Sequence, residues 1–163
     1  MSENNAHSLV ELLSSTELRI RTGVLEIPPN DLGMEREIAI ALGIGYCNLC
    51  ERRLARVPVG RKTLDTGWEK IVSDIEDAIT HRDNLGSCFL VTGMDVLLAG
   101  TDFENRKNFW NFMWGTFRGG RGLMLCLPSR ATNLFPEALR NTWEENDRLY
   151  RLQTIDEIFV RLK

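Results

Sequence analysis

Residues Pro28 to Gly33, with the sequence PPNDLG, lie between an apolar stretch and a helical pattern. Nucleotide-binding proteins place a phosphate loop in this setting. Such a loop needs glycines that aim backbone N–H groups at the phosphates, a lysine, and a Ser or Thr hydroxyl for magnesium. This turn instead has two prolines, which lack an N–H donor, and two side-chain acceptors, Asn30 and Asp31. Glu35 follows, and its charge opposes an anion at the helix start. The turn therefore has the setting of a phosphate loop without its chemistry.

The pattern C-N-L-C, formed by Cys47 and Cys50, raises the question of metal or redox chemistry. A zinc site needs two further ligands at matched spacing, and no second such pair is present, so no metal site is expected. A redox pair needs a helix N-terminus that lowers a thiol pKa, and Cys50 can begin a helix. The alternative is that these are ordinary thiols, like Cys88 and Cys126, which lie in apolar runs. Both interpretations remain open.

Two groups of basic residues are candidates for contact with an acidic partner or a nucleic-acid backbone. The alternative is solvated loop charge, because the whole chain has a net charge of -3 and a pI of about 5.5. Bulk charge therefore gives no indication of nucleic-acid or membrane binding. The candidates are Arg52, Arg53, Arg56, Arg61 and Lys62 in one group, and Arg118 and Arg121 in the other.

Strand and helix patterns alternate along the 163 residues. We expect strands at 17–27, 45–49, 88–91, 123–127 and 148–152. We expect helices at 8–15, 31–42, 50–57, 68–82, 104–117, 136–143 and 155–162. Expected caps are Asn30 or Asp31, Asp65 or Thr66, and a capping box from Thr154 to Glu157. In the helix at 104–117, the spacing of Trp110, Trp114 and Phe117 favours core packing over an interaction patch.

This alternation predicts an α/β fold, a three-layer sandwich around a mostly parallel five-stranded sheet. A length of 163 residues with 43% hydrophobic and 26% charged residues predicts a single domain, 1–163. Residues 1–16 form its N-terminal helix region and 17–163 its core. The apolar runs are strand-sized, and the polar N-terminus does not resemble a signal peptide, so a cytoplasmic location is expected.

In a parallel sheet, ligands bind beyond the carboxyl ends of the strands. The loops that matter are therefore 28–33, 92–95, 128–133 and the one that follows the second strand. They offer three candidates for nucleotide contact: Gly33, Asp95 and Ser129. For Asp95, a helix-capping role is the favoured alternative. Thr92 stands at the end of an apolar strand, where an NTPase would place an aspartate for magnesium.

The chain resembles a compact P-loop NTPase of the additional-strand (AAA/ASCE) type, over roughly residues 18–152. More specifically, it is similar to the small P-loop component of some bacterial BREX-type phage-defence loci. The resemblance rests on LGIGYCNLCERRL (42–54), the loop and helix at 58–79, FLVTGMDVLLAG (89–100), GLMLCLPS (122–129) and RLYRL (148–152). The family's phosphate loop falls at Pro28 to Met34 and its magnesium aspartate at Thr92. Both Walker motifs are absent, so the resemblance transfers no active-site role.

The resulting hypothesis is a P-loop-like adaptor, not an enzyme, in a bacterial anti-phage defence complex. It would bind no cofactor. Its partners would be other protein subunits or a second copy, with nucleic acid contacted only indirectly and no membrane. One alternative is a nucleotide-binding ATPase subunit that completes its site with a partner, using Asp95, Ser129 and Arg121. A second alternative is a thiol-redox protein that uses Cys47 and Cys50.

Overall fold

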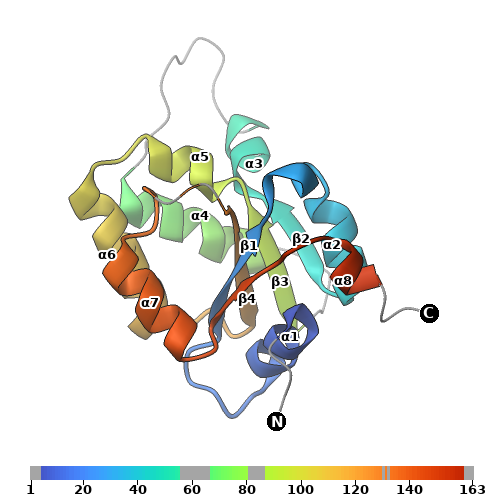
Figure 1. The fold of residues 1–163 in the computed structure, drawn as a ribbon. Coiled ribbons are helices and arrows are strands. Elements are labelled where there is room, and N and C mark those ends of the chain that lie inside the picture. The colour runs from blue at the N-terminus through green and yellow to red at the C-terminus, as the bar shows by residue number, and fades with distance from the viewer. Residues whose placement is uncertain (1–4, 56–66, 81–86, 130, 132, 160–163) are drawn as a thin grey trace.

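Five parallel strands form one sheet in the order β2-β3-β4-β1-β5 (Figure 1). The computed structural model describes residues 5–55, 67–80, 87–129, 131 and 133–159. The strands are β1 (Thr22–Ile27), β2 (Gly45–Asn48), β3 (Cys88–Thr92), β4 (Gly122–Pro128) and β5 (Leu149–Arg151). The predicted α/β class is therefore confirmed, and the sheet is parallel throughout rather than mostly so.

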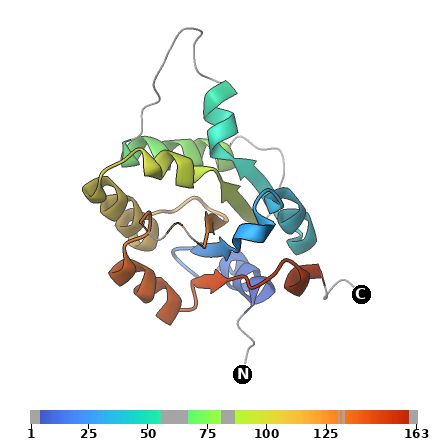
Figure 2. The same ribbon diagram turned by 45° about the horizontal axis from the view of Figure 1, so that its top comes forward.

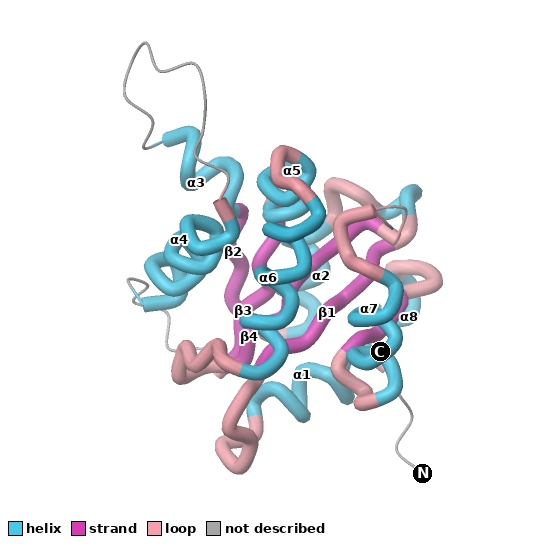
Figure 3. The backbone as a smooth tube through the Cα atoms, turned by 90° about the vertical axis from the view of Figure 1, so that its left-hand side faces the viewer, coloured by secondary structure: helices cyan, strands magenta, loops and turns pink. Residues whose placement is uncertain are grey.

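Helices cover both faces of this sheet. One face carries α4 (Trp68–Thr80), α5 (Met94–Ala99), α6 (Phe103–Gly115) and α7 (Glu137–Glu145). The other carries α1 (Ala6–Ser14), α2 (Glu35–Leu42) and α8 (Asp156–Phe159). Helix α3 (Leu49–Ala55) follows β2 and packs near α4 and α5. In Figure 3 the strands lie between α4, α6 and α7 in front and α2 behind. The arrangement is the predicted three-layer sandwich.

The central strands are apolar because both of their faces are covered. Side chains in a strand point alternately to opposite faces, which divides the core into two clusters. Val24 and Leu125 pack with α4 to α7. Leu25 and Met124, their neighbours in β1 and β4, pack with α1, α2 and α8. The unbroken apolar runs of the sequence thus supply two cores rather than one.

An aromatic cluster fills the space between α6 and α7. Trp110 stacks on Phe135 with ring centroids 3.8 Å apart and meets Trp143 edge to face at 5.8 Å. Phe117 is also buried, and Trp114 is partly buried against Trp143. The predicted core role of these residues is confirmed, so they do not form an exposed interaction patch.

The turn after β1 differs from the expectation. Asn30 and Asp31 do not cap the following helix; they lie in a 3-10 turn, η1 (Pro29–Asp31). Helix α2 begins four residues later, and its N-cap, Met34, makes no side-chain capping bond. Gly33, at φ 95°, turns the chain between the two segments. Asp31 instead accepts a hydrogen bond from the backbone N–H of Ile155 at 2.9 Å.

Two other local expectations need correction. The apolar run after β3 contains a helix, α5, which the sequence pattern does not distinguish from a strand because both are apolar. Gly93, at φ 83°, is the N-cap of this helix. Asp95 therefore lies in the first turn of α5 and not at the cap. The capping box of α8 is displaced by one residue, because Glu157 accepts from the backbone N–H of Gln153 rather than that of Thr154. The cap expected at Asp65 or Thr66 lies outside the described residues.

Helix α1 packs closely on the amino-terminal halves of β1 and β4. A Cβ atom on Gly122 would lie 2.5 Å from the backbone oxygen of Leu13, and one on Gly23 would lie 3.0 Å from the Leu9 and Leu13 side chains. Backbone cannot shift as readily as a side-chain tip. Gly122 is thus required for the approach of α1 to the sheet.

Gly122→Ala should therefore destabilise the protein by about 1–3 kcal/mol, because the added methyl group overpacks this contact. Gly115→Ala is the matched control, since a Cβ there meets no atom within 4 Å. It should be neutral or stabilise by up to about 1 kcal/mol. Urea unfolding of both variants measures the difference. Equal free energies of unfolding would show that α1 does not depend on this close approach.

Candidate functional site

The place in this fold where a ligand is expected lies between the carboxyl ends of β1 and β4. The chain leaves β1 for α2 on one face of the sheet and leaves β4 for α7 on the other. Such divergence defines a topological switch point, where open α/β sheets bind ligands. We call the side of the molecule formed by the loops that follow the strands the carboxyl edge. It lies at the top of Figure 1, near α3 and α5, and Figure 2 turns it toward the viewer.

A buried carboxylate occupies this switch point. Glu26, next to last in β1, is only 4% exposed. Arg140 of α7 reaches it with two hydrogen bonds, Nε to Oε1 at 2.6 Å and Nη2 to Oε2 at 3.1 Å. Arg151 of β5 adds a third, Nε to Oε2 at 3.2 Å. The hydrogen bonds that Arg140 donates to the Glu26 carboxylate raise the pKa of Arg140. The ion pair ties α7 and β5 to β1 and fills the space in which a ligand would lie.

Backbone bonds close the same region further. The N–H of Ser129 donates to the carbonyl oxygen of Ile27 at 2.8 Å, which continues the β1–β4 pairing past the strand ends. The N–H of Leu152 donates to the carbonyl oxygen of Glu26 at 2.9 Å. A hollow of about 10 Å³ is lined by Glu26, Leu127, Pro128, Ser129, Ala131, Phe135 and Arg140. This volume is at the lower limit for a single water molecule. It cannot take a phosphate group.

The neighbouring corner of the carboxyl edge is acidic. Burial raises the pKa of Asp95, and the negative charge of Glu35 raises it further, while the N–H groups of Asp95 and Val96 oppose the shift. The pKa of the Cys126 thiol is raised well above its usual value by burial and by the charges of Glu35 and Asp95. These three residues come from α2, α5 and β4, so their mutual influence places them at one corner. Glu35 and Asp95, when ionised, have the wrong sign of charge for binding a phosphate.

Thr92 stands at the end of β3, the position where an NTPase would place an aspartate for magnesium. Its side chain is buried. Its hydroxyl lies 3.4 Å from the Tyr46 hydroxyl and 3.5 Å from the carbonyl oxygen of Cys47 in the adjacent strand. A threonine in this position holds two strands together and offers no negative ligand to magnesium.

The sequence candidates Gly33, Asp95 and Ser129 follow β1, β3 and β4, three neighbouring strands. The structure brings them to the same edge, as predicted. Each has a local structural role: Gly33 turns the chain, Asp95 accepts from backbone N–H groups of α5, and Ser129 extends the sheet. Among the residues that the structure describes at this edge, none of these three is part of a phosphate-binding cradle.

The C-N-L-C pattern spans the end of β2 and the start of α3. Cys47 is 1% exposed and belongs to the core, whereas Cys50 is partly exposed in the first turn of the helix. All four cysteines are free thiols. Burial raises the pKa of Cys88 to about 12, which makes that thiol unreactive. Burial of Cys47 keeps its thiol from external reductants and oxidants in the folded protein.

The basic candidates separate into three groups. Arg53 is 8% exposed and ion-paired with Asp74, and Arg52 lies 3.0 Å from Asp77, so both anchor α3 to α4. Arg56, Arg61 and Lys62 lie outside the described residues. Arg118 and Arg121 line a pocket at the opposite edge of the sheet. Among the basic candidates that the structure describes, this last pair lines a charged surface.

Comparisons with known proteins assign neither a family nor a function to the chain. No protein-family model matches the chain, and comparisons with curated proteins and with solved structures give no significant match. Within the described part of the chain, no three His, Cys, Asp or Glu side chains are grouped to hold a metal ion. None of the helices described is long and apolar enough to cross a membrane. The fold is therefore established without a family, and function has to be argued from the site.

Sequence reasoning missed Glu26, the residue that defines the switch point. Its signal is present in the sequence, because a charged residue in a central parallel strand is rare without a partner. What the sequence does not reveal is the partner, since Arg140 lies 114 positions away. Arg19 and Arg21, in the loop before β1, were also missed because that segment was assigned to the first strand.

Loss of Arg140 should cost far more stability than loss of Arg151, although both contact Glu26. Arg140 has 17% of its side chain exposed and leaves a buried charge behind when removed, whereas Arg151 is 52% exposed. We expect Arg140→Gln to lower the free energy of unfolding by about 3 kcal/mol. Arg151→Gln should change it by less than about 1 kcal/mol. Similar losses in chemical denaturation would mean that Glu26 is not held mainly by α7.

Proposed function

We propose that this chain is a non-catalytic adaptor built on a P-loop-like frame, which binds protein partners through its carboxyl edge. The observation that carries the proposal is the Glu26–Arg140 ion pair at the switch point. A fold of this kind ordinarily keeps that position open for a ligand. Here a buried salt bridge and backbone bonds occupy it.

The electrostatics of the edge support the same proposal. Catalysis of phosphoryl transfer needs positive groups and a magnesium ion around the phosphates. The corresponding corner carries Glu35 and Asp95, and Thr92 replaces a magnesium-binding carboxylate. The phosphates of a nucleoside triphosphate would be repelled by these carboxylates at the position where they need positive groups. These features argue against a nucleotide-binding subunit that gains its missing groups from a partner.

The carboxyl edge also exposes large apolar side chains. Val96, beside Asp95, is 58% exposed, and Leu32, in the turn after β1, is 47% exposed. Exposed apolar residues bordered by charge are typical of protein interaction sites. A partner surface with apolar side chains and one or two basic groups would match this composition. Others of this kind on the same edge are Met34 and Leu54.

The proposed biological setting is bacterial anti-phage defence, and it rests on the resemblance to the small P-loop component of BREX-type loci. The position of β4 between β1 and β3 is consistent with an additional-strand frame. In such a complex the chain would contribute a binding surface for other subunits rather than ATP hydrolysis. Its partners would be other subunits of the complex.

Co-expression with the proteins encoded beside its own gene tests this proposal. We expect one of them to co-purify in a fixed stoichiometry. Val96→Glu should weaken that complex at least tenfold, because it adds charge within the contact. Ile40→Glu is the matched control, since Ile40 is also exposed but lies on the flank of α2. The absence of any complex, or equal weakening by both variants, would contradict the proposal.

A further inference from the structure

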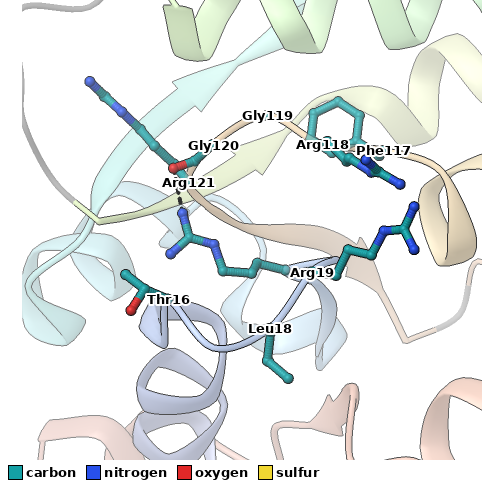
Figure 4. Close-up of a pocket in the computed structure, with 9 residues that line it drawn as sticks. Thr16, Leu18, Arg19, Phe117, Arg118, Gly119, Gly120 and Arg121 are labelled. Carbon is teal, nitrogen blue, oxygen red and sulfur yellow. Dashed lines mark hydrogen bonds between the residues drawn. The ribbon is translucent and has the colours of Figure 1, made fainter.

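A second candidate site lies at the amino edge of the sheet, which we define as the loops that precede the strands. Residues 15–21 lead into β1 and residues 116–121 lead into β4, and these strands are neighbours. The two loops form a pocket of about 310 Å³ (Figure 4). It is lined by Thr16, Leu18, Arg19, Arg21, Phe117, Arg118, Gly119, Gly120 and Arg121.

Four of these nine lining residues are arginines, and none is acidic. This concentration occurs in a chain with a net charge of -3. The nearest acid in sequence, Glu17, belongs to the first loop but does not line the pocket. The pocket is therefore a local positive region in an acidic protein, at the edge opposite the acidic corner.

The four arginines do not serve the same purpose. Arg21 donates through Nη2 to the carbonyl oxygen of Gly120 and joins the two loops. The guanidinium of Arg121 lies 5.3 Å from the centre of the Phe89 ring, directed away from the pocket (Figure 4). Both side chains hold the loops in place.

Arg19 and Arg118 are different. Both are exposed, and neither forms a hydrogen bond or ion pair with another residue in the described part of the chain. Figure 4 shows the ends of their side chains extending to the same side of the pocket. Two like charges that line one pocket, without an ion-pair partner among the described residues, repel each other, and a bound anion would relieve that repulsion.

The loop that carries Arg118 is preformed. Phe117 is buried, and a Cβ on Gly119 would lie 2.4 Å from the Ile79 side chain, so the backbone is fitted against α4. Gly120 has φ 76°, a conformation that favours glycine. An anion would thus meet Arg118 on a fixed loop and would lose little affinity to ordering of that loop.

We propose that this pocket binds a compact, multiply charged phosphate group. Guanidinium groups bind phosphate with paired hydrogen bonds, and two of them on one side match a diphosphate better than a single charge. A volume of about 310 Å³ admits a small anion. Among the lining residues that the structure describes, no aromatic face is available for a base, because Phe117, the aromatic residue there, is 2% exposed. Recognition would therefore be of the phosphate, whether inorganic or at the end of a nucleotide.

Calorimetric titration of the full chain with inorganic pyrophosphate at low salt tests the pocket. We expect saturable binding that falls at least tenfold in the double variant Arg19→Gln, Arg118→Gln. Arg36→Gln is the control for loss of positive charge, because Arg36 is exposed near β2 and stacks on Tyr46. It should leave binding unchanged. Thermal melting confirms that all variants fold, which is expected because the substituted side chains are exposed.

Further titrations identify the ligand class. ATP should compete with pyrophosphate, whereas adenosine should not, since the phosphate is what is recognised. Absence of pyrophosphate binding, an equal loss in Arg36→Gln, or equally tight binding of citrate would overturn the proposal. Binding of a DNA duplex that pyrophosphate does not displace would overturn it as well. None of these outcomes bears on the adaptor function, which depends on the opposite edge.

Discussion

The ion pair between Glu26 and Arg140 is the constraint on which this structure depends most. A carboxylate in a central parallel strand loses its hydration, and only a partner with several hydrogen bonds can compensate for that loss. Arg140 supplies two such bonds from α7, and Arg151 supplies one from β5. A buried pair of this kind contributes little net stability but strongly penalises any arrangement that breaks it. It therefore fixes where α7 lies relative to β1.

The position of this pair has a functional consequence. The divergence of the chain after β1 and β4 creates the crevice that α/β proteins use for ligands, and here α7 spans it with a charged side chain. The two edges of the sheet then differ in character. The carboxyl edge combines acids with exposed apolar residues, whereas the amino edge carries arginines without acidic neighbours in the pocket lining. Protein contact suits the first edge and anion binding the second.

Much of the fold follows from local sequence pattern. Apolar runs such as Phe89 to Val91 and helical spacings such as that of Ile71 and Ile75 predicted elements that the structure contains, because period and burial are local properties. Helix α5 was missed since an apolar run of this length suits either a strand or a helix. Both candidate sites depend on residues that are far apart in the sequence. The residues next to Glu26 or Arg118 in the sequence do not indicate that Arg140 lies beside Glu26, or that Arg19 lines the same pocket as Arg118.

The central claim is that the switch point does not bind a nucleotide, and amide NMR spectra of the labelled full chain during titration with Mg-ATP test it most directly. We predict no saturable shifts at Gly33, Asp95, Val96 or Ser129, which surround the closed switch point. Shifts confined to residues 16–21 and 117–122 would agree with this account, because they belong to the amino-edge pocket. Saturable, magnesium-dependent shifts at Gly33, Asp95 and Ser129 would contradict it.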